Sequence, residues 1–152
     1  MLRKIKKFFA LSSEEKKLFL EAFMTLGLMR AALLLFSFKR LTRSLEQQKN
    51  RSEMKPLSDQ EQKNAIAVGT AIMRASAYTP WESACLVQSM TAQRMLHKRG
   101  ISGVFYLGAM KDKEKAGEIK AHAWSQCGDM IITGKKGHEE FTVLSVFGWG
   151  KE

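Results

Sequence analysis

Two residues of the 152-residue sequence, Cys85 and His122, have the types and the spacing needed for covalent catalysis. Cys85 lies in a segment whose apolar residues recur with helical spacing, and His122 lies in an alternating segment typical of a strand. The positive end of a helix dipole stabilises a thiolate, and a nearby imidazolium adds to this effect. The pair could therefore supply a nucleophile and an acid that protonates a leaving amine. The alternative from spacing alone is a small buried thiol and an ordinary strand histidine.

The helix that carries Cys85 is the most clearly delimited element of the sequence. Pro80 suits its first turn, which places Cys85 about one turn into the helix. Gly100 follows two basic residues as the expected C-terminal stop. The pattern then becomes extended and predicts four strands, at 104–110, 119–127, 130–133 and 141–147, with Gly128 and Asp129 as a hairpin turn. The fold class expected from this order is α+β, with the nucleophile helix packed on an antiparallel sheet.

The first 56 residues read as a helical arm and a linker. Ser12 and Glu15 have the form of a capping box that begins a helix, and Gly27 is interpreted as a joint before a second helix at 28–45. Residues 47–56 are polar and end in proline, so we predict a linker there and a domain boundary near 56. A second capping box, at Ser58, begins a helix that should stop before Pro80. The predicted units are therefore 1–56 and 57–152.

The net charge of +10 is concentrated in the predicted arm and linker. Residues 1–56 hold 13 Lys or Arg and 5 Asp or Glu, whereas residues 57–152 hold 12 and 10. The basic start imitates a signal peptide, but charged residues soon interrupt it, and the later apolar run at 18–38 contains Glu21 and Arg30. We expect helices packed against protein rather than a spanning segment. Peripheral contact with a membrane surface stays open as an alternative.

Other function classes find little support in the residues. Two cysteines are too few for a disulfide scaffold, so a cytoplasmic location with free thiols is expected, although a Cys85–Cys127 disulfide stays open. No Cys and His spacing suggests zinc, and no glycine motif suggests a bound nucleotide, so no metal or cofactor is expected. The basic residues lack the aromatic pattern of common single-strand binders, so we expect no nucleic-acid partner.

Four motifs in order resemble the leader peptidases of lasso-peptide biosynthesis, which belong to the transglutaminase-like cysteine peptidases. They are PWESACLVQ at 80–88, MLHKRG at 95–100, LG at 107–108 and AHAW at 121–124. The helical stretch at 11–43 also resembles the region that precedes the peptidase domain in this family.

The resemblance implies proteolysis of a ribosomally made precursor. Removal of the leader would free the amine of the first core residue, which a separate lasso cyclase condenses with an Asp or Glu side chain. Members of this length look like the stand-alone peptidase, so the implied partners are the precursor peptide and a separate leader-recognition protein. The residue matches imply that Cys85 is the nucleophile and that His122 is the general base and acid.

The third catalytic position departs from the family pattern. Members often place an Asp on the strand next to the histidine, where this sequence has Thr133 and Gly134. Thr133 or a backbone carbonyl could hold the imidazole instead, whereas Asp129 at the hairpin turn lies too far along the strand. Glu139 and Glu140 remain loop candidates.

An oxyanion in this site would meet the Cys85 amide and one side-chain donor, for which Trp81 and Gln88 are the candidates. Helix packing is the alternative role of Gln88.

Two other functions are alternatives to the leader peptidase. The same Cys–His pair could perform another acyl transfer, as in a transglutaminase or an amidase, and the nucleophile that resolves the thioester would distinguish these enzymes from a peptidase. A non-enzymatic basic adaptor at a membrane surface is the second alternative, and its function would survive Cys85→Ala.

Overall fold

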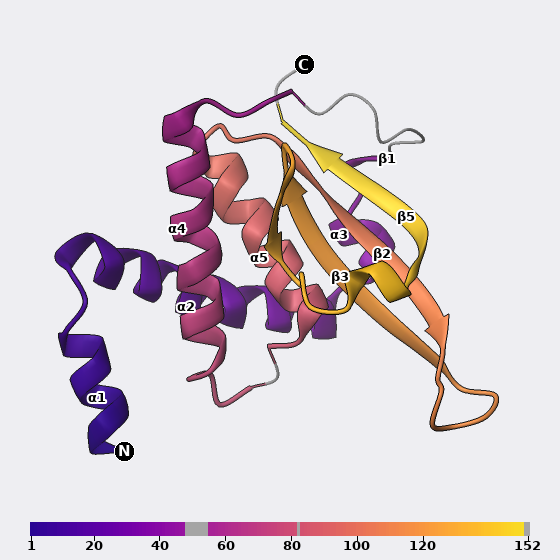
Figure 1. The fold of residues 1–152 in the computed structure, drawn as a ribbon, viewed down its shortest axis with the longest axis horizontal. Coiled ribbons are helices and arrows are strands. Elements are labelled where there is room, and N and C mark those ends of the chain that lie inside the picture. Colours follow the sequence, from indigo (N-terminus) through magenta and orange to yellow (C-terminus); the bar gives the residue numbers. More distant parts are fainter. Residues whose placement is uncertain (48–54, 82, 151–152) are drawn as a thin grey trace.

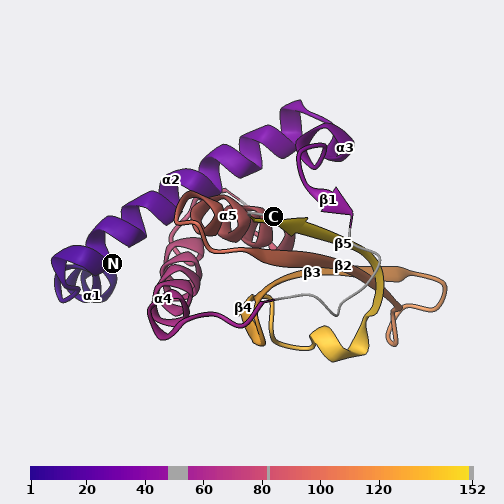
Figure 2. The same ribbon diagram turned by 90° about the horizontal axis from the view of Figure 1, so that it is seen from above.

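The computed structural model describes residues 1–47, 55–81 and 83–150. Within these residues the fold is α+β, as predicted from the order of elements. Figures 1 and 2 show three layers, with one long helix lying over two others and the sheet on their far side. The middle helical layer therefore packs against apolar surface on both sides, so that one core holds the three layers together.

The N-terminal part of the chain is helical. Helix α1 spans Leu2–Phe9, α2 spans Ser13–Leu35, and a single turn, α3, spans Phe38–Leu41. The predicted capping box begins α2: the hydroxyl of Ser12 accepts from the Glu15 amide, and the Glu15 carboxylate accepts from the Ser12 amide. The reciprocal pair satisfies two amides that the first turn would leave exposed.

Two helices lie between α2 and the sheet. Helix α4 spans Asp59–Ser76 and begins with the second predicted capping box, between Ser58 and Glu61. Helix α5 spans Cys85–Lys98 and is followed by Gly100, whose φ of 71° fits the predicted helix stop. Gly69 of α4 lies close to β4: a Cβ at this position would lie 2.8 Å from the Ile132 carbonyl oxygen.

The antiparallel sheet has the strand order β1-β5-β2-β3-β4. Its strands are β1 (Glu46–Gln47), β2 (Gly103–Lys111), β3 (Ile119–Cys127), β4 (Met130–Thr133) and β5 (Thr142–Trp149), and a 3-10 turn, η2 (His138–Glu140), precedes β5. Cys127 pairs with Met130, which confirms the two-residue hairpin turn. Helix α5 contacts β2, β3 and β4, and α4 contacts β4.

Three local predictions were wrong. Helix α2 passes through Gly27 without a joint, and Gly27 is instead the place where Trp81 approaches: a Cβ there would lie 3.0 Å from the Trp81 ring. Helix α5 begins at Cys85 rather than Pro80. Gln47, the first residue of the predicted linker, forms β1 together with Glu46, and β1 pairs with β5.

The arm and the predicted second unit share one core. Ala22, Leu26 and Met29 of α2 are buried in the same cluster as residues of α4, α5 and the sheet. The rest of the predicted linker, 48–54, lies outside the described residues. The boundary at residue 56 stays a prediction, and the hydrophobic core extends across it.

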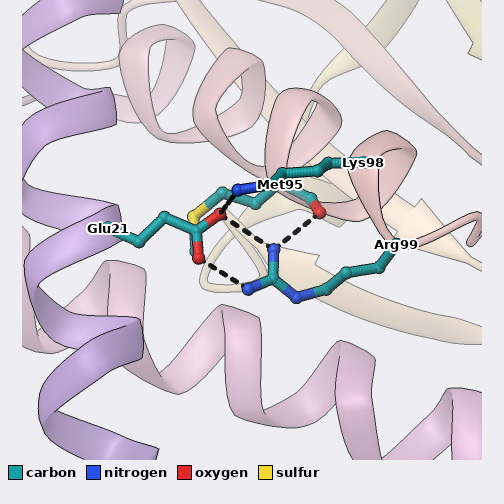
Figure 3. Close-up of polar contacts among 4 residues, drawn as sticks. All are labelled: Glu21, Met95, Lys98 and Arg99. Carbon is teal, nitrogen blue, oxygen red and sulfur yellow. Dashed lines mark hydrogen bonds and ion pairs between the residues drawn. The ribbon is translucent and has the colours of Figure 1, made fainter.

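An ion pair joins α2 to the end of α5 (Figure 3). The Arg99 guanidinium donates to both oxygens of Glu21, over 2.6 and 3.0 Å, and also to the Met95 carbonyl over 2.9 Å. Lys98 lies 3.6 Å from the same carboxylate. The Arg99 hydrogen bond is the main cause that lowers the pKa of Glu21. Glu21, one of the two charges that interrupt the apolar run, therefore faces the protein rather than solvent.

Candidate active site

Cys85 is the first residue of α5, and Ala84 precedes it as a cap residue without a side-chain hydrogen bond. Its thiol is free and half-buried. The first amides of a helix have no partner within the helix, so the Cys85 amide lies among donors that could meet a developing oxyanion. This position is closer to the positive end of the helix dipole than the one predicted from Pro80.

His122 is held by a backbone carbonyl. Its Nε2 lies 2.7 Å from the Gly134 carbonyl oxygen, and because a carbonyl only accepts, Nε2 carries the proton. In the neutral ring Nδ1 is then the acceptor and is the atom that could take a proton from a thiol. The ring stacks on Trp124 at 5.7 Å between centroids and contacts Phe141 at 5.0 Å. Two aromatic rings and one hydrogen bond thus orient the imidazole.

Within the described residues no hydrogen bond joins Thr133 to His122, so the structure gives no support to its predicted role as the residue that holds the imidazole. Its buried hydroxyl lies 2.6 Å from Ser125 Oγ and 3.3 Å from Ser89 Oγ. A straight two-residue hairpin would pair Thr133 with Trp124, on the face of His122. A register shift between Ser125 and Gln126 pairs it with Ser125 instead. A shift of one residue reverses the face of a strand residue, so Thr133 points toward α5.

The group that contacts the imidazole is therefore a backbone carbonyl, which was the predicted alternative to Thr133. Gly134 has a φ of 73°, a conformation that glycine adopts without strain, and its Cα lies against the backbone of β3: a Cβ there would meet the Ala123 carbonyl and Trp124. The loop candidates Glu139 and Glu140 are exposed, and within the described residues neither forms a hydrogen bond or an ion pair with His122.

The hydroxyl cluster of Ser89, Thr133 and Ser125 ties the first part of α5 to the strands that hold His122. Ser89 lies one turn after Cys85, and Gly134 directly follows Thr133. In Figure 1, α5 and β3 run in roughly the same direction, so the first turn of α5 lies toward the part of β3 that carries His122. This hydroxyl cluster was not predicted from the sequence, although Cys85 and Ser89 have the spacing of residues on one helix face, which was a signal for it.

The two predicted catalytic residues, Cys85 and His122, lie toward different faces of the sheet. Ser125 faces α5, so by alternation His122 and Trp124 lie on the other face of β3, as the sequence pattern predicted. Within the described residues no hydrogen bond joins Cys85 Sγ to the imidazole. The edge strand β4 ends at Thr133, which pairs with Ser125, so β4 does not extend as far as His122.

The two oxyanion candidates flank Cys85 but differ in what they contact. One amide N–H of Gln88 donates to the Ser83 carbonyl over 2.8 Å, so this side chain braces the segment before the nucleophile. Trp81 packs on Phe23 of α2 at 5.1 Å between ring centroids. Its indole Nε1 is buried and has no hydrogen-bond partner among the described residues. Trp81 is therefore the candidate whose donor is uncommitted; the neighbouring Glu82 lies outside the described residues.

The second cysteine differs chemically from the first. Cys127 is buried in the core, and burial raises the pKa of its thiol to about 12. Both thiols are free, so the Cys85–Cys127 disulfide left open in the sequence is absent from this structure. The described residues contain no group of three or more His, Cys, Asp and Glu side chains arranged to hold a metal.

Comparison with known proteins agrees with this architecture. The family model of the transglutaminase-like superfamily matches residues 32–146, which include the end of α2, Cys85, His122 and nearly the whole sheet. Comparisons with curated proteins and with solved structures returned no significant match. The match covers well over half of the chain and fits a helix-borne cysteine on an antiparallel sheet, so the chain belongs to the transglutaminase-like superfamily.

Proposed function

We propose that the protein is a cysteine peptidase that removes the leader from a lasso-peptide precursor. Two observations support the proposal: a free, half-buried thiol lies at the first residue of α5, and the Gly134 carbonyl orients His122 on the neighbouring strand β3. Membership of the transglutaminase-like superfamily supports cysteine-based acyl transfer in general. The motifs at 80–88, 95–100 and 121–124 support the choice of leader peptidase within it.

In the proposed acylation step, His122 Nδ1 takes the thiol proton and Cys85 Sγ attacks the carbonyl carbon of the last leader residue. The C–S bond forms, and the oxyanion is met by the Cys85 amide and the Trp81 indole N–H. The imidazolium then protonates the core nitrogen as the C–N bond breaks, which releases the core peptide with a free amine. The step requires Sγ and Nδ1, which lie toward different faces of β3 in this structure, to come within hydrogen-bond distance.

In the proposed deacylation step, His122 takes a proton from water as the water oxygen attacks the thioester. The C–S bond breaks, the leader leaves with a carboxylate end, and the thiol regains its proton. An amine in place of water would give a transamidation product, which is the outcome expected of a transglutaminase. The freed core amine is the group that a separate lasso cyclase would use, and a leader-recognition protein would deliver the precursor.

The test is to incubate the full chain with the precursor peptide and the leader-recognition protein, and to identify the products by mass spectrometry. We expect cleavage at the leader–core junction, with a gain of one water across the two products. Cys85→Ala and His122→Ala should lose cleavage by at least about a hundredfold, since each removes a group that acts in the transition state.

Cys127→Ala is the matched control, because it removes the other thiol far from the proposed chemistry and should retain cleavage. Cleavage that persists in Cys85→Ala would overturn the assignment. Amine incorporation in place of hydrolysis would keep the nucleophile and replace the peptidase by a transamidase.

A further inference from the structure

We infer that α1 and the outer face of α2 form a docking surface for an anionic lipid bilayer, on which the protein lies without crossing it. The inference concerns a surface outside the proposed active site and does not depend on the peptidase assignment. It rests on an exposed apolar stripe, on basic groups at both ends of that stripe and on the pairing of the nearby carboxylates with the body of the protein.

The apolar stripe runs along α2 from Leu20 to Leu35, on the side away from α4 and α5. It is formed by residues spaced three or four apart, which a helix places on one face: Leu20, Met24, Leu28, Ala31 and Leu35. The stripe is exposed, with relative accessibilities of 73% for Met24 and 76% for Leu35. Figure 2 shows α2 as the outermost layer, so no described element covers this side. An apolar row of this length is unusual on a surface that only contacts water.

Basic residues lie at both ends of the stripe. In α1, Leu2, Ile5 and Phe9 occupy one side of the helix and the basic residues Arg3, Lys4, Lys6 and Lys7 occupy the other. The far end of α2 leads into α3, where Lys39 and Arg40 are exposed. Residues 1–45 hold ten Lys or Arg and three Glu in all. Each basic residue near an anionic membrane contributes about 1 kcal/mol of attraction, so this charge favours acidic lipid over a neutral partner.

The acidic residues of this region do not oppose such a contact. Glu15 accepts from the Ser12 amide at the start of α2 and pairs with Arg74 of α4. Glu21 pairs with Arg99 and Lys98 of α5. Basic residues of α4 and α5 thus neutralise two of the three carboxylates. Within the described residues the third, Glu14, is exposed and forms no ion pair with the body of the protein. The remaining field at this surface is strongly positive.

A contact along the surface fits the structure better than a span. By length and composition α2 could cross a membrane. Its opposite face, however, supplies Ala22, Leu26 and Met29 to the core. Crossing the bilayer would take these residues out of the core and would break the Glu21–Arg99 pair. Lying flat buries the stripe in the interface and leaves the inner face as it is.

The junction of α1 and α2 adds a place for apolar lipid groups. A groove of about 350 Å³ between them is lined by Met1, Lys4, Ile5, Phe8, Phe19, Phe23 and Tyr78. The Lys4 ammonium lies over the Tyr78 ring at 5.3 Å, and the Lys16 ammonium lies over the Phe8 ring at 6.0 Å. The combination of an apolar floor and basic rim matches an acyl chain with an acidic headgroup.

The experiment measures partitioning of the full chain onto vesicles by co-sedimentation, using phosphatidylcholine alone and mixed with phosphatidylglycerol at about three to one. We expect binding to the mixed vesicles that weakens with salt, and little binding to phosphatidylcholine alone. Met24→Ser with Leu28→Ser should reduce partitioning about tenfold, because two exposed apolar anchors are removed. Lys6→Glu with Lys7→Glu should reduce it at least about tenfold.

Matched controls make the same changes elsewhere on the surface. Ile66→Ser with Met73→Ser alters two exposed apolar residues of α4, and Lys111→Glu with Lys113→Glu reverses two charges at the start of the β2–β3 loop; both should bind as the unmodified chain does. Circular dichroism checks that every variant is folded. Failure of the unmodified chain to bind mixed vesicles would overturn the proposal, and so would unchanged binding of the stripe variant. A dimer that the stripe variant dissociates, with no vesicle binding, would assign the surface to a second copy instead.

Discussion

The contact between His122 and the Gly134 carbonyl has a chemical consequence for the site. A carbonyl dipole fixes the tautomer and the ring orientation, as an acid would, but it stabilises the imidazolium less than a carboxylate does. Cysteine chemistry tolerates this arrangement because a thiol ionises far more readily than a hydroxyl. In the proposed site the backbone would therefore take the third position, with a geometry that depends on the glycine that follows β4.

The two thiols should differ sharply in reactivity. Treatment of the folded protein with iodoacetamide near neutral pH should modify Cys85 and leave Cys127 unmodified, because only thiolate reacts and burial raises the pKa of Cys127 to about 12. Peptide mass spectrometry gives the modified site. In denaturant both residues should react. Modification of Cys127 at a rate similar to Cys85 in the folded state would contradict the burial described here.

The hydroxyl of Thr133 should matter for stability rather than for the protonation of His122. Thr133→Val keeps the shape but leaves Ser89 and Ser125 without this partner, so the free energy of unfolding should fall by about 1–3 kcal/mol. Thr133→Ser retains the hydroxyl and should lose less. Denaturant unfolding measures both changes. Loss of activity in a Thr133→Val protein that is still folded would instead give Thr133 a part in the chemistry.

At the scale of elements, α2 acts as a support for the nucleophile segment. Its Gly27 leaves room for Trp81, its Phe23 packs on the same ring, and its Glu21 holds the C-terminal end of α5 through Arg99. Both ends of the segment that contains Cys85 are thus fixed by one helix. All three residues of α2 lie before residue 32, where the family match begins, so this support comes from outside the matched region.

The Glu21–Arg99 pair should make part of the stability depend on pH. The pKa of Glu21 is lowered from 4.5, chiefly by the Arg99 hydrogen bond, so its stabilisation is present above that value and is lost as the pH falls through the lower folded value. Glu21→Gln should reduce the free energy of unfolding at pH 7 by about 1–2 kcal/mol, and this difference should shrink in acid.

Urea unfolding at several pH values measures the effect. Glu14→Gln serves as the matched control, because Glu14 is exposed and lies outside the pair. A difference between Glu21→Gln and the unmodified chain that stays constant into strong acid would contradict the ion pair as its cause.

At the scale of the whole molecule, the N-terminal region divides into two parts with different roles. Helix α1 buries none of its residues, whereas α2 contributes three buried residues to the core. Helix α2 holds three basic and three acidic residues, so the charge excess of the first 56 residues lies mainly in the four basic residues of α1 and the three at 39–43. The proposed lipid surface lies where these two parts meet.

Truncations should separate the two parts. Removal of residues 1–10 should lower the melting temperature by only a few degrees, since it removes mainly surface contacts such as that between Phe8 and Phe19. Removal of residues 1–36 should prevent folding, because it takes Ala22, Leu26 and Met29 out of the core. Thermal circular dichroism and solubility test both. A folded product of the longer deletion would show that α2 is dispensable for the core.

Much of the architecture was predictable from local patterns. The capping boxes at Ser12 and Ser58, the stop at Gly100 and the two-residue turn at Gly128 depend on backbone groups close in sequence, and the structure confirms them. The same holds for the alternation that sets His122 apart from Ser125. Errors arose where distant residues decide the outcome: Gly27 reads as a joint until Trp81 is known to lie against it.

The sequence by itself determined which residues are available for the proposed chemistry, namely a helix-borne Cys85 and a strand-borne His122, because their local periodicities assign the elements that carry them. Only the tertiary structure decided what orients the imidazole. The register shift in β4 turns Thr133 toward α5, and it is the Gly134 carbonyl that contacts His122. A one-residue shift in pairing leaves no local trace in composition or spacing, since it depends on contacts between strands and helices rather than along the chain.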